Sequence, residues 1–522
     1  MRLPATGFVL SFWSRLVCWR RLSARLLVLF LALLQCGLPV GAQSTLPTLG
    51  DGGEMSASSE RRLGDRIARE LYRSPEYLDD AVLGEYVEQV WRKLLEAARR
   101  RGELPQELDE RFAWELLLIR DRSVNAFALP GGYMGVHLGL IAAVASEDEL
   151  ASVLAHETSH ITQRHIARML GRQSNQAPWL LGAMILGALA ASSNPSAAGA
   201  MIVGGQAAAV QGQLNFSRDM EREADRVGYG VMTQAGFNPR GFVSMFEKLQ
   251  QANRFNDTGS FPYLRSHPLT TERIADMQAR QQLLAPGPAE SLTMSHAMLA
   301  ARARVLANPE VDSLRAAIAQ ADGANFDQMS PAQQAGALYG AVMGALGLRE
   351  FGQAQGWLDR LGALVRNDTQ ALYEQRLLAI EHALAADERP RAQQLLAAAA
   401  AMPQAQQSRP LLFLRARAWT QGKRAREAAE QLQVWLAARP HDAQAWQLLS
   451  AAYAAQGQTL RAIRAEAEVQ AARLDYAAAQ DRLRAAQELA RQGQATDHIE
   501  ASIIDTRSRE IESLLREQAL ER

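Results

Sequence analysis

The chain has 522 residues, of which 48% are hydrophobic and 21% are charged, so it is neither a disordered nor a collagen-like protein. A chain of this length is expected to form two or three domains. The 56 basic and 56 acidic residues balance, but five arginines precede residue 43 and no acid does. The remaining chain carries 51 basic and 56 acidic residues, and this net charge of −5 does not indicate nucleic-acid binding.

The N-terminal segment 1–42 has the pattern of a secretory signal peptide. Three arginines precede the apolar run 26–34, and small residues at 40–42 offer a cleavage site. A spanning helix needs ~20 apolar residues, so this run favours a cleaved leader over an uncleaved anchor. Both cysteines, Cys18 and Cys36, lie in this segment, so the mature chain would contain neither a disulfide nor a catalytic thiol.

The mature chain is predicted to begin with a polar segment, followed by helices and a small sheet. Residues 43–58 are rich in Ser, Gly and Thr, and we expect a flexible N-terminus there. Apolar residues that recur every three or four positions predict helix over 61–100. Alternation over 112–118, and extended runs at 124–129 and 133–137 on either side of a Gly-Gly turn, predict the sheet.

A single helix is predicted from Ser146 to about Leu170, where Gly171 ends it. Ser146 and Glu149 have the spacing of a capping box at its start. The next segment, residues 172–212, is rich in Gly, Ala and Ser and contains one apolar stretch too short to cross a membrane. A buried helix and a mobile loop both fit that segment.

The middle of the predicted helix carries a metal-binding motif, His156-Glu157-Thr158-Ser159-His160. Residues four apart share a helix face, so both imidazoles can bind one ion, as is common in zinc proteases. Glu157 can reach a metal-bound water and take its proton. Apolar flanking residues predict that this helix is buried, and a buried helix does not carry two histidines and a glutamate without partners.

A third ligand has to come from another part of the chain. Gln163 and Ile166 stand where the metzincin pattern has glycine and histidine. His165 lies nine residues after His156, about half a turn from the ligand face of a continuous helix. We therefore interpret His165 as a residue that supports a ligand or lies on the surface.

A glutamate from a later helix, which begins near Ser217, is the alternative third ligand. Glu221 and Asp225 are four residues apart and share a face, whereas Glu223 points elsewhere. We interpret Glu221 as the ligand and Asp225 as the supporting acid one turn on. The competing interpretation is a charged helix surface paired with neighbouring arginines.

From about residue 290 the composition shifts to Ala, Leu, Gln and Arg with helical spacing almost throughout. Equivalent positions recur at a fixed interval, in the pairs Leu412 and Trp446, Ala416 and Ser450, Trp419 and Tyr453, and Ala428 and Ala462. This interval resembles the period of tetratricopeptide repeats, about 34 residues, in which small residues lie where two helices cross. Generic helical hairpins are the alternative.

Two motifs together resemble the peptidase family of HtpX and the CAAX prenyl proteases. They are residues 156–160 with Arg164-His165 after them, and Ser217-Arg218 with Glu221-Arg222-Glu223-Ala224-Asp225 downstream. The resemblance implies one Zn²⁺ per chain, bound by His156, His160 and Glu221, with Glu157 as the general base. It also implies a catalytic role for Asp225, as a proton donor or as a support of the ligands.

The resemblance further implies a strand beside the cleft, matched here by Asn125-Ala126-Phe127. The edge of such a strand can hold an extended peptide by backbone hydrogen bonds; an ordinary core hairpin is the alternative. Three protein ligands leave zinc one open position, and His267 is our candidate for a regulatory fourth ligand that swings onto it. The competing role for His267 is to cap a helix that starts near Thr270.

These features predict two domains after the leader. Residues 59–285 are expected to form an α+β zincin-type metalloprotease domain, mostly helical with a small sheet, and residues 290–522 an all-α tetratricopeptide-repeat solenoid. The leader and the repeats favour a periplasmic member of the family, and the resemblance then implies an endopeptidase that degrades misassembled outer-membrane β-barrel proteins and assists the assembly of others. The alternative is a latched chaperone or adaptor in which proteolysis is secondary.

The expected partners follow from that resemblance. They are unfolded or stalled outer-membrane β-barrel proteins and, through the repeats, the β-barrel assembly machinery. Peripheral contact with a membrane is also considered, whereas no nucleic acid is expected. The sequence does not nominate the group that stabilises the oxyanion.

Overall fold

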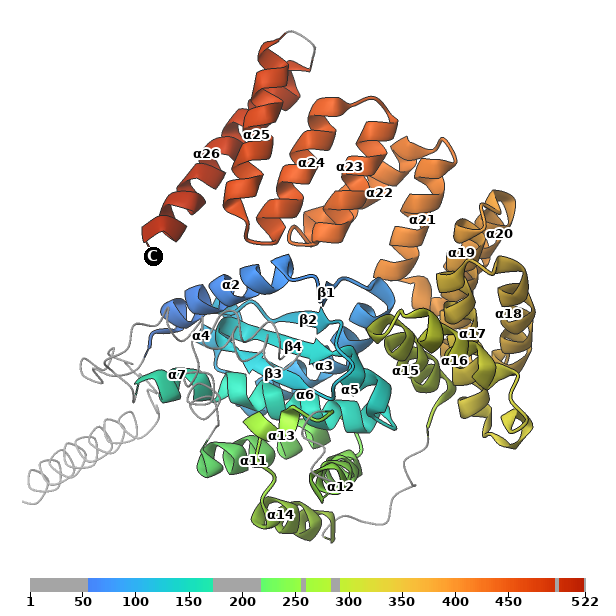
Figure 1. Cartoon of the computed structure of the whole chain (residues 1–522). Coiled ribbons are helices and arrows are strands. Elements are labelled where there is room, and N and C mark those ends of the chain that lie inside the picture. The colour runs from blue at the N-terminus through green and yellow to red at the C-terminus, as the bar shows by residue number, and fades with distance from the viewer. Residues whose placement is uncertain (1–54, 172–216, 255–259, 283–291, 493–496, 521–522) are drawn as a thin grey trace, which may run out of the picture. The chain divides into compact units, whose positions relative to one another are not determined.

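The computed structural model describes residues 55–171, 217–254, 260–282, 292–492 and 497–520 (Figure 1). The predicted signal peptide, most of the predicted flexible start and the segment 172–212 lie outside these residues. Within the described ranges, every helix is too short or too polar to cross a membrane.

A four-stranded sheet forms the centre of the N-terminal part. Its strands are β1 (Tyr77–Leu78), β2 (Glu115–Ile119), β3 (Ala126–Leu129) and β4 (Tyr133–His137), in the order β1-β2-β4-β3. β3 and β4 form the predicted antiparallel hairpin, while β2 runs parallel to β4, with Leu117 opposite Gly135. The predicted sheet is confirmed, but the sequence analysis missed the two-residue strand β1. β3 is an edge strand of this sheet.

The two faces of the sheet pack against different helices (Figure 1). On one face Leu117 and Leu129 join Ile67 of α2 (Ala57–Arg73) in an apolar cluster. On the other face Leu118 and Met134 belong to the core shared with α3 (Ala81–Arg101) and α6 (Glu147–Thr162). The alternation of apolar residues in β2 thus places one helix layer on each side.

The Gly-Gly turn between β3 and β4 lies against α2. Gly131 and Gly132 have φ values of 74° and 86°, which favour glycine. A Cβ on Gly131 would lie 2.7 Å from the Cα of Arg61, so this turn also needs glycine for close packing. α2 begins at Ala57 with Ser56 as its N-cap, so it includes two residues that we assigned to the flexible start. The helix predicted over 61–100 is two helices, α2 and α3, separated by β1.

The helix that was predicted to run unbroken to Leu170 is broken at Arg164. α6 ends at Thr162, and α7 (His165–Gly171) starts after Arg164, whose φ of 52° lies in the left-handed region. The prediction of one continuous helix was therefore wrong. The sequence does not reveal the break, because neither glycine nor proline stands there. The other helices of this part are α4 (Gln106–Arg111), α5 (Leu138–Ala143), α11 (Arg218–Gln234), α12 (Arg240–Arg254), α13 (Tyr263–Ser266) and α14 (Thr271–Gln282).

The described chain from Met294 onward is helical apart from short turns. α21 and α23 start at Arg409 and Ala443, and α22 and α24 start at Ala425 and Thr459, so both intervals equal the predicted period. The period is therefore present as helix pairs. These helices are α15 (Met294–Ala307), α16 (Val311–Ala321), α17 (Pro331–Leu348), α18 (Phe351–Val365), α19 (Thr369–Ala385), α20 (Arg389–Ala400), α21 (Arg409–Gln421), α22 (Ala425–Ala438), α23 (Ala443–Ala455), α24 (Thr459–Ala472), α25 (Tyr476–Arg491) and α26 (His498–Leu520).

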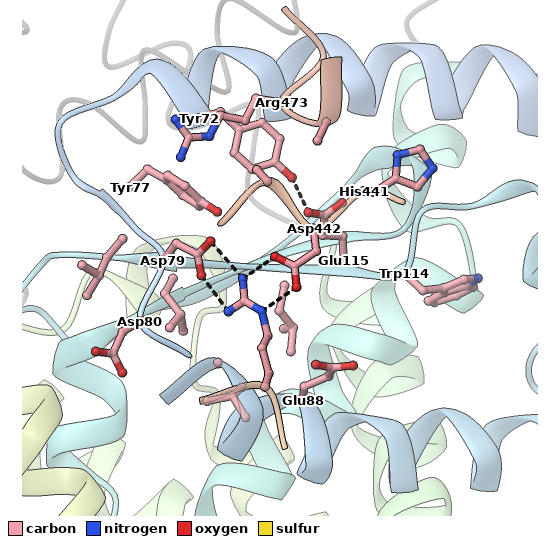
Figure 2. A pocket seen from close by; sticks show the side chains of 18 of the residues that line it. Tyr72, Tyr77, Asp79, Asp80, Glu88, Trp114, Glu115, His441, Asp442 and Arg473 are labelled. Atoms are coloured by element: carbon pink, nitrogen blue, oxygen red, sulfur yellow. Dashed lines mark hydrogen bonds and ion pairs between the residues drawn. The ribbon is translucent and has the colours of Figure 1, made fainter. Parts of the chain in front are cut away.

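Apolar and ionic contacts join the helical part to α3 and the segment before it. The core around Val87 of α3 continues into Leu299 of α15 and Leu377 of α19. A cavity of about 220 Å³ lies beside this junction, and Figure 2 shows Asp79 and Asp442 among its lining residues. The guanidinium of Arg409 lies 2.8 Å from Asp79 Oδ1 and 2.9 Å from Asp442 Oδ1 and so bridges the two carboxylates.

Candidate metal centre

The candidate centre is built on α6, a helix whose middle and end are buried on all sides. Its N-cap Ser146 accepts a hydrogen bond from the backbone N–H of Glu149 at 3.1 Å. The Glu149 carboxylate instead accepts the N–H of Ala145 and lies 2.6 Å from Nζ of Lys248. Only half of the predicted capping box is present, because the lysine and the preceding backbone compete for the glutamate.

Four buried side chains meet on one side of α6. The Nε2 atoms of His156 and His160 are 3.0 Å apart, and each is 3.5 Å from a carboxylate oxygen of Glu221. His267 Nδ1 lies 3.3 Å from His156 Nε2 and 3.0 Å from Glu221 Oε1. One ligand atom from each of the four lies within 4.8 Å of the others. The three predicted ligands and the predicted regulatory histidine are thus brought together.

The donor set fits a zinc ion. Two histidines and one carboxylate are the protein ligands of several catalytic zinc sites, and a fourth nitrogen completes a tetrahedral set. Each of these side chains is about 2% exposed or less, so water cannot solvate the facing nitrogens and the carboxylate. A cation among them would compensate the buried carboxylate and use the nitrogen lone pairs.

Glu157 is held between the sheet and the ligand group. Its Oε2 accepts a hydrogen bond of 2.9 Å from the backbone N–H of Ala128 in β3. Its Oε1 lies 3.4 Å from Nε2 of His267. The edge strand β3 therefore touches the predicted general base directly, and one carboxylate oxygen points toward the ligand group.

The predicted substrate-binding residues lie at the start of β3. Ala126 and Phe127 belong to this strand, and Asn125 precedes it, with its carbonyl accepting the N–H of His137 at 3.1 Å. Asn125 and Ala126 are buried, whereas Phe127 is partly exposed. The edge position agrees with a strand that can pair with a peptide, and the binding itself stays a prediction.

Asp225 supports the centre from behind His156. Its Oδ1 lies 2.9 Å from His156 Nδ1, and Arg273 of α14 contacts both carboxylate oxygens, at 2.6 and 2.8 Å. Arg273 Nη1 also lies 2.7 Å from Glu221 Oε2. Burial raises the pKa of Asp225, but the Arg273 guanidinium outweighs it, so the pKa of this carboxyl lies below its usual value. Asp225 is placed to orient the His156 ring, as carboxylates behind ligating histidines do.

A series of side-chain contacts also supports His160. The Nδ1 atoms of His160 and His165 are 2.9 Å apart, His165 Nε2 is 3.1 Å from Glu223 Oε2, and Arg168 is 2.9 Å from the same oxygen. The break in the helix at Arg164 brings the His165 ring next to His160. Glu223 points away from the ligand atoms, as predicted, but the sequence analysis missed its connection to His160.

His267 directly follows α13 and stacks on Tyr263, with ring centroids 4.5 Å apart. It does not cap the next helix, because Thr270 Oγ1 accepts the N–H of Arg273 at the start of α14. The competing capping role for His267 is therefore wrong. Arg273 was also missed: a buried arginine in a polar helix has no local sequence signal.

Comparisons with known proteins agree with this geometry. Residues 85–281 match the model of peptidase family M48. A beta-barrel assembly-enhancing protease of Escherichia coli K12 is 30% identical over 475 residues, which are 88% of this chain and 91% of that protein. A Vibrio cholerae relative is 32% identical over 62% of this chain and 65% of its own length.

A further relative aligns with a smaller share of the chain. The mitochondrial metalloendopeptidase OMA1 of Saccharomyces cerevisiae is 29% identical over 196 residues, which are 37% of this chain and 54% of that protein. The family match and the similarity over most of the chain indicate the same kind of enzyme as the buried histidine–glutamate group does. The chain therefore belongs to peptidase family M48 and is a metallopeptidase.

Proposed function

We propose that this chain is a zinc-dependent endopeptidase of the periplasm that cleaves misassembled outer-membrane β-barrel proteins and assists the assembly of others. The observation that carries the proposal is the contact of Glu157, which lies beside the buried histidine–glutamate group, with the edge strand β3. The relative named beta-barrel assembly-enhancing protease, which aligns with 88% of the chain, supports the substrate class. The predicted leader supports the compartment.

The residues of the chain divide the catalytic work. His156, His160 and Glu221 would hold the zinc, which would supply Lewis-acid activation of water. Glu157 would act as the general base: the N–H of Ala128 fixes Oε2 and leaves Oε1 to accept a proton. Among the described residues no strand pairs with the outer edge of β3, so its backbone groups other than the Ala128 N–H can hold an extended peptide beside this base.

We propose that His267 closes the site in the arrangement described here. Its ring nitrogens lie 3.3 Å from His156, 3.0 Å from Glu221 and 3.4 Å from Glu157, in the space that a substrate carbonyl would need. As a fourth ligand, it would fill the open position that a catalytic zinc site requires. Substrate binding would then have to displace the loop around His267.

The second candidate function is a latched chaperone or adaptor. The position of His267 favours it, because a closed site does not cleave. In this alternative the helical part, which we interpret as tetratricopeptide repeats, binds the β-barrel assembly machinery or stalled barrel proteins. Proteolysis would then be secondary.

Cleavage of an unfolded outer-membrane β-barrel protein by the full-length chain separates these functions. Glu157→Gln should retain one zinc per chain and lower cleavage by roughly 10²–10⁴-fold, the usual contribution of a general base. Equal cleavage by wild type and Glu157→Gln would refute the endopeptidase function. An undetectable rate in both proteins, with normal binding of the barrel protein, would favour the adaptor.

A separate experiment tests the latch, which is the proposed closure of the site by His267. His267→Ala should increase hydrolysis of a short unstructured peptide without reducing the zinc content, whereas His498→Ala, at an exposed position at the start of α26, should change neither. A flat or reduced rate in His267→Ala would refute the latch and leave the proposed base unaffected.

A further inference from the structure

A second cavity, of about 230 Å³, lies between α3, α19 and the segment before α21. Its polar walls include two acids, Glu85 and Glu374, and two phenols, Tyr86 and Tyr373. Among its described lining residues there is no lysine, arginine or histidine. The remaining lining residues are amides or apolar: Val82, Gln89, Leu299, Gln370, Leu377, Pro403, Gln404, Gln406 and Pro410.

Glu374 provides a buried carboxylate oxygen without a donor. The residue is 3% exposed. Its Oε1 accepts hydrogen bonds from Ser295 Oγ at 2.6 Å and from Gln370 Nε2 at 3.1 Å. Its Oε2 has no hydrogen-bond partner in the described part of the chain. Burying such an oxygen costs free energy unless a donor is supplied.

The other polar walls also present acceptors. Glu85 accepts a hydrogen bond from Ser408 at 3.1 Å, and Gln404 Oε1 has no donor among the described residues. Tyr86 O lies 2.7 Å from His296 Nδ1, while His296 Nε2 lies 2.9 Å from the carbonyl of Val144. His296 therefore donates from Nε2 and accepts from Tyr86, which leaves the phenol oxygen as an acceptor.

The neighbouring cavity shows how acids at this junction are normally satisfied. There Arg409 pairs with Asp79 and Asp442, and Glu115 accepts a hydrogen bond from Tyr72 (Figure 2). Arg409 opposes the rise in the pKa of Glu85 through its charge and a backbone hydrogen bond, but its guanidinium already pairs with Asp79 and Asp442. Burial raises the pKa of both Glu85 and Glu374 to about 7, as expected for carboxyls without a bound cation.

We propose that this cavity binds the side chain of a lysine or arginine presented by a partner protein segment. The cationic head would meet Glu374, Glu85 and the acceptor oxygens, and the aliphatic stem would pack on the apolar lining residues. The cavity is smaller than ordinary cofactor or drug sites, so it suits one side chain. A hydrated metal ion would gain nothing from the apolar walls. This proposal does not depend on the proposed function.

The test uses the full-length protein and two small probes, N-acetyl-lysine methylamide and its Nε-acetylated form, with binding followed by saturation-transfer NMR. The lysine probe should bind at least about tenfold more tightly, because only it carries a charge. Glu374→Gln keeps both hydrogen-bond partners of Oε1 and should weaken lysine binding by about tenfold or more. Glu85→Gln provides a second variant from a different helix.

Glu96→Gln, an exposed glutamate on α3 away from the cavity, is the matched control and should leave lysine binding unchanged. Equal affinity for the two probes, equal loss in Glu96→Gln and Glu374→Gln, or no binding of the lysine probe would overturn the proposal. Displacement of the lysine probe by millimolar Ca²⁺ in wild type but not in Glu374→Gln would also overturn it, by assigning the cavity to a metal.

Discussion

Replacing Arg273 by glutamine tests the arrangement behind the metal ligands most directly. Arg273 is 3% exposed and compensates two buried carboxylates, through contacts of 2.6 and 2.8 Å to Asp225 and 2.7 Å to Glu221. Breaking a buried ion pair by removing one partner costs about 3–5 kcal/mol. At 2–4 °C per kcal/mol for a domain of 150–250 residues, the metal-free protein should unfold roughly 6–20 °C lower.

The assay is thermal unfolding of the chelator-treated full-length chain, followed by circular dichroism. Asp225→Asn/Arg273→Gln should recover part of the loss, because the uncompensated charge on Asp225 is then absent. Zinc should also reduce the difference, because it compensates Glu221 in place of the guanidinium. Strictly additive effects of the two substitutions, or a shift below about 2 °C, would show that Arg273 is not the buried counter-ion.

Three further predictions concern the ligands and the junction. Glu221→Gln should abolish measurable zinc binding in equilibrium dialysis. Asp225→Asn should weaken zinc binding by about 10–100-fold, since a carboxylate behind a histidine orients the ring. Similar losses in the two variants would contradict the assigned roles. Glu223→Gln should weaken zinc binding by less than about tenfold, since it acts through His165, and a loss as large as that of Asp225→Asn would show a direct role. Ending the chain at residue 290 removes α15, which packs against α5, so the fragment should unfold at a lower temperature than the full chain; an unchanged midpoint would show that α15 does not support the peptidase part.

The grouping of the candidate ligands could be predicted because their signals are local. His156 and His160, and also Glu221 and Asp225, are four residues apart, and helical periodicity alone puts each pair on one face. β3 and β4 were predicted from extended runs on either side of a Gly-Gly turn, which is also a local signal. The parallel pairing of β2 with β4 was not, since parallel neighbours are joined by long-range contacts that no short pattern encodes.

The supporting residues could not be predicted because their roles depend on tertiary contacts. Arg273 reaches Asp225 from a later helix, and in the sequence it looks like any arginine on a polar helix. The link from Glu223 to His160 depends on the left-handed Arg164, a conformation that most arginines avoid. A continuous helix would have pointed His165 away from the ligand, so one backbone torsion determines whether this support exists.

The junction with the helical part shows a related difference between composition and packing. The composition changes near residue 290, but composition reports only local helix preference. Burial depends instead on which surface each helix face contacts. The core around Val87 continues into Leu299 and Leu377 on the far side of that change. A cationic side chain bound at Glu374 would therefore contact both parts of the chain at once. α3 also packs on α6, and Trp91 Nε1 donates a hydrogen bond to Thr158 Oγ1 inside the metal-binding motif, so one helix contacts both the junction and the centre.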